Sequence, residues 1–291
     1  MTNPSRPHPR PDFLRRQQFL RDDRSADRVL AHYILERELS DRLRGTPREN
    51  RSRVYSEVYE ELFASLPDHP QHRSRFQVLN HVGPQVSRLG NGLHRDSVFL
   101  EIGCGDAALA FAMAGRVRKA YGLDVTDALI DFGSLPPNFS FLRTGGVEIP
   151  LPSGEVDFAY SNQLMEHLHP DDAADQLTEV YRVLKSGGCY MCITPSRVTG
   201  PHDVSCYFDY EATGFHLREY DYGVLQALFR KAGFQNFSCS ASIKGREIRV
   251  PYFAVRAAER GLLLLPPHVR ASLTSSHVVQ AILGLTASAV K

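Results

Sequence analysis

The chain has 291 residues, of which 42% are hydrophobic and 23% are charged, a composition that excludes a mainly disordered protein. Its 34 Lys and Arg residues nearly balance its 33 Asp and Glu residues, so the net charge of +1 gives no global basic field for nucleic acid. No apolar run approaches the roughly 20 residues that span a bilayer, and the polar N-terminal segment shows no signal-peptide core.

The five cysteines contain one C-x-x-C pattern, Cys189 and Cys192, which lies in a strand-like run. In a strand these two thiols point to opposite faces, so neither a metal site nor a redox pair is expected from them. We therefore expect a reducing, cytoplasmic location for the protein.

Residues 1–54 are rich in arginine, with 13 Arg against 8 Asp and Glu. Apolar residues recur at helical spacing in 13–23 and 26–43, and two further helices are predicted in 55–73 and 75–89. We expect 1–94 to form a helical arm or lid that packs on the main body or on a second subunit, which would allow a homodimer. A nucleic-acid-binding arm is the alternative, but alternating acids weaken its charge.

The rest of the chain alternates between strand and helix signals. Strands are predicted at 97–105, 119–126, 139–146, 156–163 and 189–196, and helices at 108–117, 170–188 and 219–234, the last two ending at glycines. This alternation is typical of an α/β, doubly wound parallel sheet, in which ligands bind at the carboxyl ends of the strands.

A glycine turn directly follows the first of these strands. Gly103 and Gly105 lack side chains, so the backbone there can approach a ligand next to a helix N-terminus. Asp124 ends the next strand, at the position where an acid accepts the ribose hydroxyls of a nucleoside. Two more acids, Glu101 and Asp106, flank the turn, which favours a cationic nucleoside over the pyrophosphate of NAD.

The segments VFLEIGCGDA, YGLDVT, EIPLPSGEVDFAYSNQLMEHL and EVYRVLKSGG resemble successive motifs of the class I S-adenosylmethionine-dependent methyltransferases, over about residues 95–195. The resemblance implies a Rossmann-like, seven-stranded sheet with an antiparallel last strand over 95–291, and S-adenosylmethionine as cofactor. It implies cofactor contacts by Glu101, Gly103, Cys104, Gly105, Asp124, Val125, Asn162 and Gln163. An adenine-binding acid usual in the family is missing, so backbone groups near Gly146 and Val147 are expected to replace it.

The family sheet requires two more strands, which we place at 237–243 and 281–291, with a helical insertion at 251–276 between them. A terminal helix over 277–291 is the alternative. Gly284 and Thr286 weaken such a helix, which favours the strand.

His167 follows the fourth strand and is the best-placed base for an acceptor that must lose a proton. Alternatively, Glu166 and His167 form a structural pair that caps the loop. Ubiquinone-biosynthesis O-methyltransferases resemble this segment and bind a divalent metal through Glu-x-x-Glu-His. Gln163 replaces the first Glu here, so no metal is predicted.

The aromatic and polar segment 200–220 lies where acceptor-binding loops occur in this fold. We expect Asp203, Tyr207 and Tyr210 to contact the substrate, and His202 or His216 to replace His167 as base. For any one of these histidines a buried structural role is the alternative.

The sequence therefore predicts methyl transfer to a small-molecule acceptor, most simply O-methylation of a sugar, lipid precursor or natural product, with no nucleic-acid partner. C- or N-methylation is the enzymatic alternative. A catalytically silent nucleoside-binding subunit and an NAD-dependent oxidoreductase are the other hypotheses.

Overall fold

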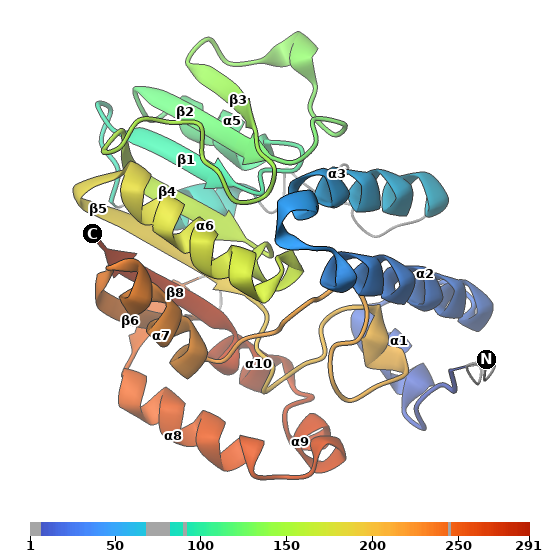
Figure 1. Cartoon of the computed structure of the whole chain (residues 1–291). Coiled ribbons are helices and arrows are strands. Elements are labelled where there is room, and N and C mark those ends of the chain that lie inside the picture. The colour runs from blue at the N-terminus through green and yellow to red at the C-terminus, as the bar shows by residue number, and fades with distance from the viewer. Residues whose placement is uncertain (1–6, 68–81, 90–91, 244–245) are drawn as a thin grey trace.

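The computed structural model describes residues 7–67, 82–89, 92–243 and 246–291. One mixed sheet runs through these residues in the strand order β3-β2-β1-β4-β5-β8-β6-β7 (Figure 1). The strands are β1 (Val98–Ile102), β2 (Lys119–Asp124), β3 (Phe139–Arg143), β4 (Val156–Asn162), β5 (Leu184–Thr194), β6 (Gln235–Ile243), β7 (Arg246–Val250) and β8 (Leu285–Val290). The first five strands are parallel to one another, as expected from the strand–helix alternation.

Helices cover both faces of the sheet, so each face has its own apolar cluster. The helices are α1 (Phe13–Leu20), α2 (Ala26–Gly45), α3 (Arg48–Ser65), α5 (Ala108–Ala114), α6 (Pro170–Val183), α7 (Tyr222–Ala232), α8 (Tyr252–Leu263), α9 (Pro267–Leu273) and α10 (His277–Leu283). Residues 82–89 are also helical. They pack with α5 on one face, and α6 and α7 pack on the other, in front of the sheet in Figure 1.

The sheet has eight strands rather than the predicted seven. The additional strand is β7, which forms an antiparallel hairpin with β6 and pairs Val250 with Cys239. No strand was predicted at 246–250, because so short a segment directly before Pro251 carries little strand signal of its own.

The predicted helix over 170–188 ends earlier than its Gly-Gly pair. Helix α6 stops at Val183, and the chain enters β5 at Leu184, so both glycines lie inside a strand. Gly187 has φ of +77°, and the pairing of β4 with β5 shifts register between Val156 and Phe158. The glycines therefore belong to an irregular strand start and not to a helix C-cap.

The C-terminal segment combines both alternatives considered from the sequence. Residues His277–Leu283 form α10, whose N-cap Ser276 accepts a hydrogen bond from the Val279 amide. The chain then becomes β8, which lies antiparallel between β5 and β6. The antiparallel last strand and the two insertion helices around the Pro266–Pro267 break are confirmed, but the strand begins at Leu285 and not at 281.

Helices α2 and α3 are part of the main core. Leu43 on α2 and Val58 on α3 are fully buried, in the same apolar cluster as the sheet residues Leu100 and Ala159. Figure 1 shows both helices beyond the carboxyl ends of the parallel strands. The boundary after residue 94 stays a prediction, although the arm shares its core with the sheet.

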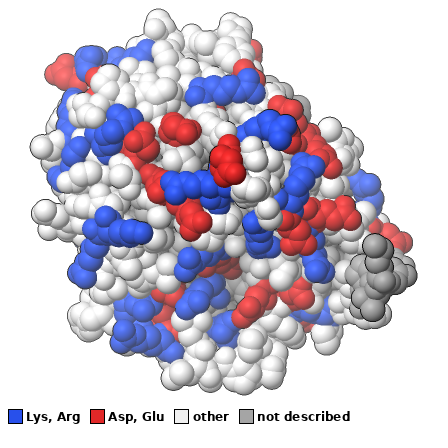
Figure 2. Space-filling model, viewed as in Figure 1, with Lys and Arg blue, Asp and Glu red and all other residues white. Residues whose placement is uncertain are grey.

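The surface carries charges of both signs. Figure 2 shows Lys and Arg side chains interspersed with Asp and Glu over the face that it presents. Throughout the described ranges, no helix combines the length and the apolar character needed to cross a membrane. The five cysteines are free thiols, and Cys189 and Cys192 pack on opposite faces of the sheet, as predicted.

Candidate functional site

The glycine turn after β1 is held against the end of β2 by backbone hydrogen bonds. The Gly103 and Cys104 amides both donate to the carbonyl oxygen of Leu123, at 2.8 and 3.1 Å. Gly103 and Gly105 have φ of +70° and +53°, a region that glycine enters without steric cost. The turn therefore exposes its backbone at the carboxyl edge of the sheet, as the sequence predicts.

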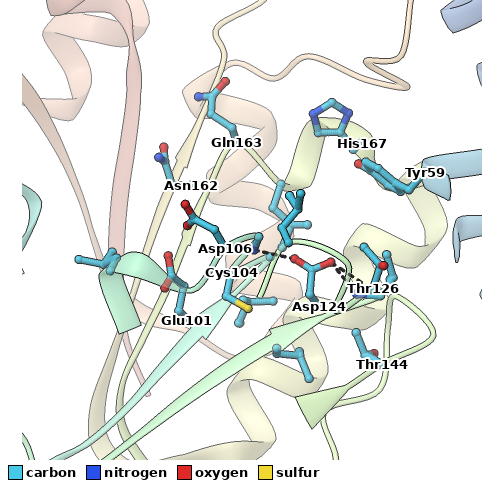
Figure 3. Close-up of a pocket in the computed structure, with 18 of the residues that line it drawn as sticks. Tyr59, Glu101, Cys104, Asp106, Asp124, Thr126, Thr144, Asn162, Gln163 and His167 are labelled. Carbon is cyan, nitrogen blue, oxygen red and sulfur yellow. Dashed lines mark hydrogen bonds between the residues drawn. The ribbon is translucent and has the colours of Figure 1, made fainter. Parts of the chain in front are cut away.

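Asp124 closes this turn from the neighbouring strand. Its Oδ2 accepts a hydrogen bond of 2.8 Å from the Gly105 amide, and its Oδ1 accepts one of 2.7 Å from the Val125 amide. Figure 3 shows Asp124 in the middle of the residues that line the cavity. Burial raises the pKa of this carboxyl group, while its backbone hydrogen bonds lower it.

Three carboxylates meet at this end of the cavity. Glu101 is 8% exposed, and its Oε2 accepts a hydrogen bond of 2.9 Å from the Ala110 amide. Burial raises the pKa of Glu101 to about 8, and the negative charges of Asp106 and Asp124 act in the same direction. Because no Lys or Arg is found among the described residues that line the cavity, a cationic ligand would be favoured here.

The cavity has a volume of about 420 Å³, within the usual range for small-molecule sites. Most residues predicted from the motifs line it, namely Glu101, Gly103, Cys104, Gly105, Asp124, Val125, Gly146, Asn162, Gln163 and His167. Val147 is not among the lining residues.

The turn after β3 lacks the acid that the family usually places there. Thr144 and Gly146 line the cavity instead, and the Thr144 hydroxyl accepts a hydrogen bond of 3.1 Å from the Gly146 amide. The side chain of Gln176, on α6, donates to the Gly146 carbonyl oxygen at 2.6 Å. Both backbone groups of Gly146 thus have protein partners, so the expected backbone contact to adenine stays a prediction.

Helix α3 supplies an aromatic wall that the sequence analysis missed. Tyr55, Tyr59 and Phe63 all line the cavity from this helix. A Cβ added to Gly146 would lie 2.9 Å from the Tyr55 ring, so glycine is needed for this close approach. The sequence does place these aromatic residues at i, i+4 and i+8, on one face of a helix. This spacing alone does not show which part of the protein that face contacts.

His167 lies at the wall of the cavity beside Tyr59 (Figure 3). The two ring centroids are 6.2 Å apart. Nδ1 of His167 lies 3.1 Å from the carbonyl oxygen of Phe215. Because a carbonyl only accepts hydrogen bonds, Nδ1 carries the proton in the neutral ring and Nε2 is the basic nitrogen. His167 is therefore suited to accept a proton.

The other two candidate bases do not line this cavity. His216 is buried, and its Nδ1 hydrogen-bonds Glu219 at 2.9 Å. Burial opposes protonation of His216, but the Glu219 hydrogen bond and the charge of Asp203 outweigh it and raise its pKa to about 9. His202 is exposed and hydrogen-bonds the Thr199 hydroxyl at 2.9 Å. The structure thus brings only His167 to the cavity.

The predicted substrate residues of the segment 200–220 are also absent from the cavity lining. The Tyr207 hydroxyl donates to Asp22 at 2.9 Å, and the Arg10 guanidinium stacks 3.7 Å above the Tyr210 ring. Asp203 is the N-cap of the short helix Val204–Tyr207. The contacts of Tyr207 and Tyr210 join the N-terminal arm to the loop, and a direct substrate role for the three residues stays a prediction.

One group of potential metal ligands adjoins the cavity. Ligand atoms of Glu166, His167 and His216 lie within 4.8 Å of one another. Glu166 is fully buried, its Oε2 accepts a 2.8 Å hydrogen bond from Thr194, and its Oε1 has no hydrogen-bond partner among the described residues. Burial raises the pKa of Glu166 to about 7. The absence of a metal requirement, predicted from Gln163, remains untested.

The sequence of this chain is similar to those of known methyltransferases. Residues 100–192 match the model of a methyltransferase domain family. The chain is 34% identical over 137 residues to a probable S-adenosylmethionine-dependent methyltransferase of Mycolicibacterium smegmatis, covering 47% of this chain and 51% of the relative. A Mycobacterium tuberculosis protein of the same description is 31% identical over 151 residues, covering 52% and 53%. The chain thus spans about half the length of these curated relatives.

Solved structures support the fold. A chain from the complex between the Haloferax volcanii Trm112 methyltransferase activator and a putative methyltransferase matches with a TM-score of 0.54 and 17% identity, covering 75% of this chain and 93% of that one. A possible histamine N-methyltransferase of Thermotoga maritima matches with a TM-score of 0.51 and 15% identity, covering 78% and 97%. The predicted Rossmann-like α/β fold is confirmed.

Proposed function

We propose that this chain, whose residues 100–192 match a methyltransferase domain family, is an S-adenosylmethionine-dependent methyltransferase that methylates a hydroxyl group of a small molecule. The observation that carries the proposal is the presence, in one cavity, of the carboxylates of Glu101, Asp106 and Asp124 and the imidazole of His167. The carboxylates suit a cationic nucleoside, and the imidazole suits an acceptor that must lose a proton.

The described residues fit S-adenosylmethionine, which supplies a methyl group carried on a positively charged sulfur. Asp124 ends β2 and lines the cavity. The Gly105 and Val125 amides orient its carboxylate, whose oxygens can also accept hydrogen bonds from ribose hydroxyls. The turn of Gly103 and Gly105 leaves room for the ligand beside it. Asp106 and Asp124 add negative charge at the same end of the cavity, where it favours a cation, and the Glu101 carboxyl group lies beside them.

His167 then acts as the general base. Its Nδ1–H donates to the Phe215 carbonyl, which fixes the ring and leaves Nε2 as the proton acceptor. A hydroxyl oxygen becomes a better nucleophile as its proton passes to Nε2. Tyr59 beside the imidazole, with Phe63 next to it on α3, provides apolar surface that can cover the C–H face of the acceptor. A sugar, a lipid precursor or another natural product with a hydroxyl group would present both features.

The test is transfer of labelled methyl groups by the purified chain to a panel of hydroxyl, amine and carbon acceptors. Label recovered on hydroxyl acceptors, and lost in His167→Ala, is the expected result. Label recovered only on amines or carbon would replace O-methylation by N- or C-methylation. Cofactor binding without transfer to any acceptor, alone or with added cell extract, would favour a catalytically silent nucleoside-binding subunit.

A further inference from the structure

The carbonyl group that orients His167 belongs to the peptide unit between Phe215 and His216. The imidazole Nδ1 of His167 donates to the oxygen of this unit at 3.1 Å. The amide N–H of the same unit, on His216, donates to Oδ2 of Asp203 at 3.2 Å. A carboxylate, one peptide bond and an imidazole are thus joined in series.

This series has a simple electrostatic consequence. A carboxylate that accepts from a peptide N–H polarises the unit and makes its carbonyl oxygen more negative, so hydrogen bonds along the chain reinforce one another. The more negative oxygen is a better acceptor for the Nδ1 proton of His167. It also favours the imidazolium that forms when Nε2 takes a proton.

Asp203 is itself held in place by its surroundings. Its Oδ1 accepts hydrogen bonds from the amide, at 3.0 Å, and from the hydroxyl of Ser205. Gly214 allows the approach of Oδ2, because a Cβ added to that glycine would lie 2.7 Å from this oxygen. The same Cβ would lie 2.5 Å from Oε2 of Glu36, so glycine at this position leaves room for both carboxylates.

Glu36 on α2 provides a built-in comparison. Its Oε2 accepts a hydrogen bond of 2.9 Å from the Phe215 amide, which belongs to the preceding peptide unit. Glu36 therefore holds the same loop to the N-terminal arm without contacting the unit that touches His167. If both carboxylates only held the loop in place, substitutions of Asp203 and of Glu36 would have similar effects on His167.

We propose that Asp203 is a positioning residue for His167, acting through the Phe215–His216 peptide unit. The inference rests on the proposed function, because it assigns Asp203 to the orientation of the proposed base. It also gives a role to a residue that the sequence analysis expected to bind substrate. Asp203 fixes the plane of the peptide unit and keeps the proton of the neutral ring on Nδ1, so that Nε2 is the basic nitrogen.

The first readout is independent of activity. In ¹⁵N-histidine-labelled protein, with the His167 signals assigned by their loss in His167→Gln, the wild type should show protonated Nδ1 and unprotonated Nε2. Asp203→Ala should raise the population of the Nε2–H tautomer, whereas Glu36→Gln should leave it unchanged. An unchanged His167 tautomer in Asp203→Ala, or equal changes in both variants, would overturn the proposal.

The second readout separates turnover from binding. Asp203→Ala should lower kcat about 10- to 100-fold while the KM for the cofactor stays within about twofold. Asp203→Asn, which keeps the volume and one acceptor oxygen, should lose about 3- to 10-fold. Gly214→Ala should reproduce the loss by displacing the carboxylate, whereas Gly261→Ala, with no atom within 4 Å of the added Cβ, should have no effect. Loss of cofactor affinity with unchanged kcat in the Asp203 variants would contradict the proposal.

The outcomes also distinguish this proposal from the proposed function. If the tautomer of His167 depends on Asp203 but the chain transfers no methyl group, the positioning contact is supported and the proposed function fails. If His167→Ala abolishes transfer while the Asp203 variants retain the wild-type kcat and tautomer, the base is supported and the positioning role fails.

Discussion

The amide of Gly105 donates a 2.8 Å hydrogen bond to Oδ2 of Asp124, which joins the glycine turn after β1 to the acid that ends β2. The two parts of the predicted cofactor motif are therefore one structural unit. The hydrogen bond orients the carboxylate at the end of the cavity. Substitution of Asp124 should therefore weaken cofactor binding more than it weakens binding of the methyl acceptor.

Asp124→Ala should weaken S-adenosylmethionine binding by about 2–3 kcal/mol, or roughly 30- to 150-fold, because the ribose hydroxyls lose their acceptor. Isothermal titration calorimetry measures this affinity. Asp127→Ala serves as the matched control, since Asp127 is close in sequence but does not line the cavity. An unchanged dissociation constant in Asp124→Ala would show that the site is assigned wrongly.

His167→Ala should lower the rate of methyl transfer to a hydroxyl acceptor by about 10²- to 10⁴-fold, because the general base is lost. Cofactor affinity should stay nearly unchanged. Single-turnover assays and calorimetry measure the two quantities separately. Full activity in His167→Ala combined with loss in His216→Ala would move the base to the loop, and loss of cofactor affinity in His167→Ala would indicate a structural role.

Burial raises the pKa of Glu101 from its ordinary value of 4.5 to about 8. Between these two values the folded protein binds a proton that the unfolded chain has released, so the free energy of unfolding should fall as pH rises through this window. Glu101→Gln cannot ionise and should make this pH dependence shallower. Urea unfolding at pH 5, 6.5 and 8 measures the slope, and the exposed control Glu49→Gln should retain the wild-type slope.

The protein should need no hard divalent cation. Gln163 is neutral, and the converging group near the cavity has one carboxylate and two imidazoles, whereas Mg²⁺ prefers oxygen ligands. Activity should therefore survive treatment with EDTA. Activity that EDTA abolishes and Mg²⁺ restores would refute this expectation.

The N-terminal arm should be required for stability. Leu43 is fully buried in the cluster that includes the sheet, so Leu43→Ala should lower the free energy of unfolding by about 2–5 kcal/mol. Leu14, which is 71% exposed, provides a control for which Leu14→Ala should cost less than about 0.5 kcal/mol. Equal effects of the two substitutions on urea unfolding would indicate that the arm is a separate lid.

The parts of the site that were predictable from sequence depend on short stretches of chain. Gly103, Gly105 and Asp124 follow directly from where two strands end, because the carboxyl ends of parallel strands meet at one edge. His167 could be placed in the same way, after β4. These positions are set by where the strands end and by the parallel direction of the strands, which the apolar pattern and the strand–helix alternation of the sequence indicate.

The rest depends on which distant surfaces meet. Tyr59 faces the cavity because α3 packs beyond the carboxyl edge of the sheet, and no local pattern fixes that docking. Tyr207 and Tyr210 were expected at the substrate, but they contact Asp22 and Arg10 of the arm. Gly187 was expected to end a helix, because glycine commonly follows the last helical turn. Its segment instead belongs to β5, which pairs with the distant strands β4 and β8.

The most direct test of the account is calorimetric titration of the wild-type chain with S-adenosylmethionine and, separately, with NAD⁺. The acidic groups around the glycine turn, and the absence of Lys and Arg among the described residues that line the cavity, predict one-site binding of the cationic cofactor and no measurable binding of the dinucleotide. The S-adenosylmethionine signal should fall strongly in Asp124→Ala. Saturable binding of NAD⁺, without binding of S-adenosylmethionine, would contradict the account.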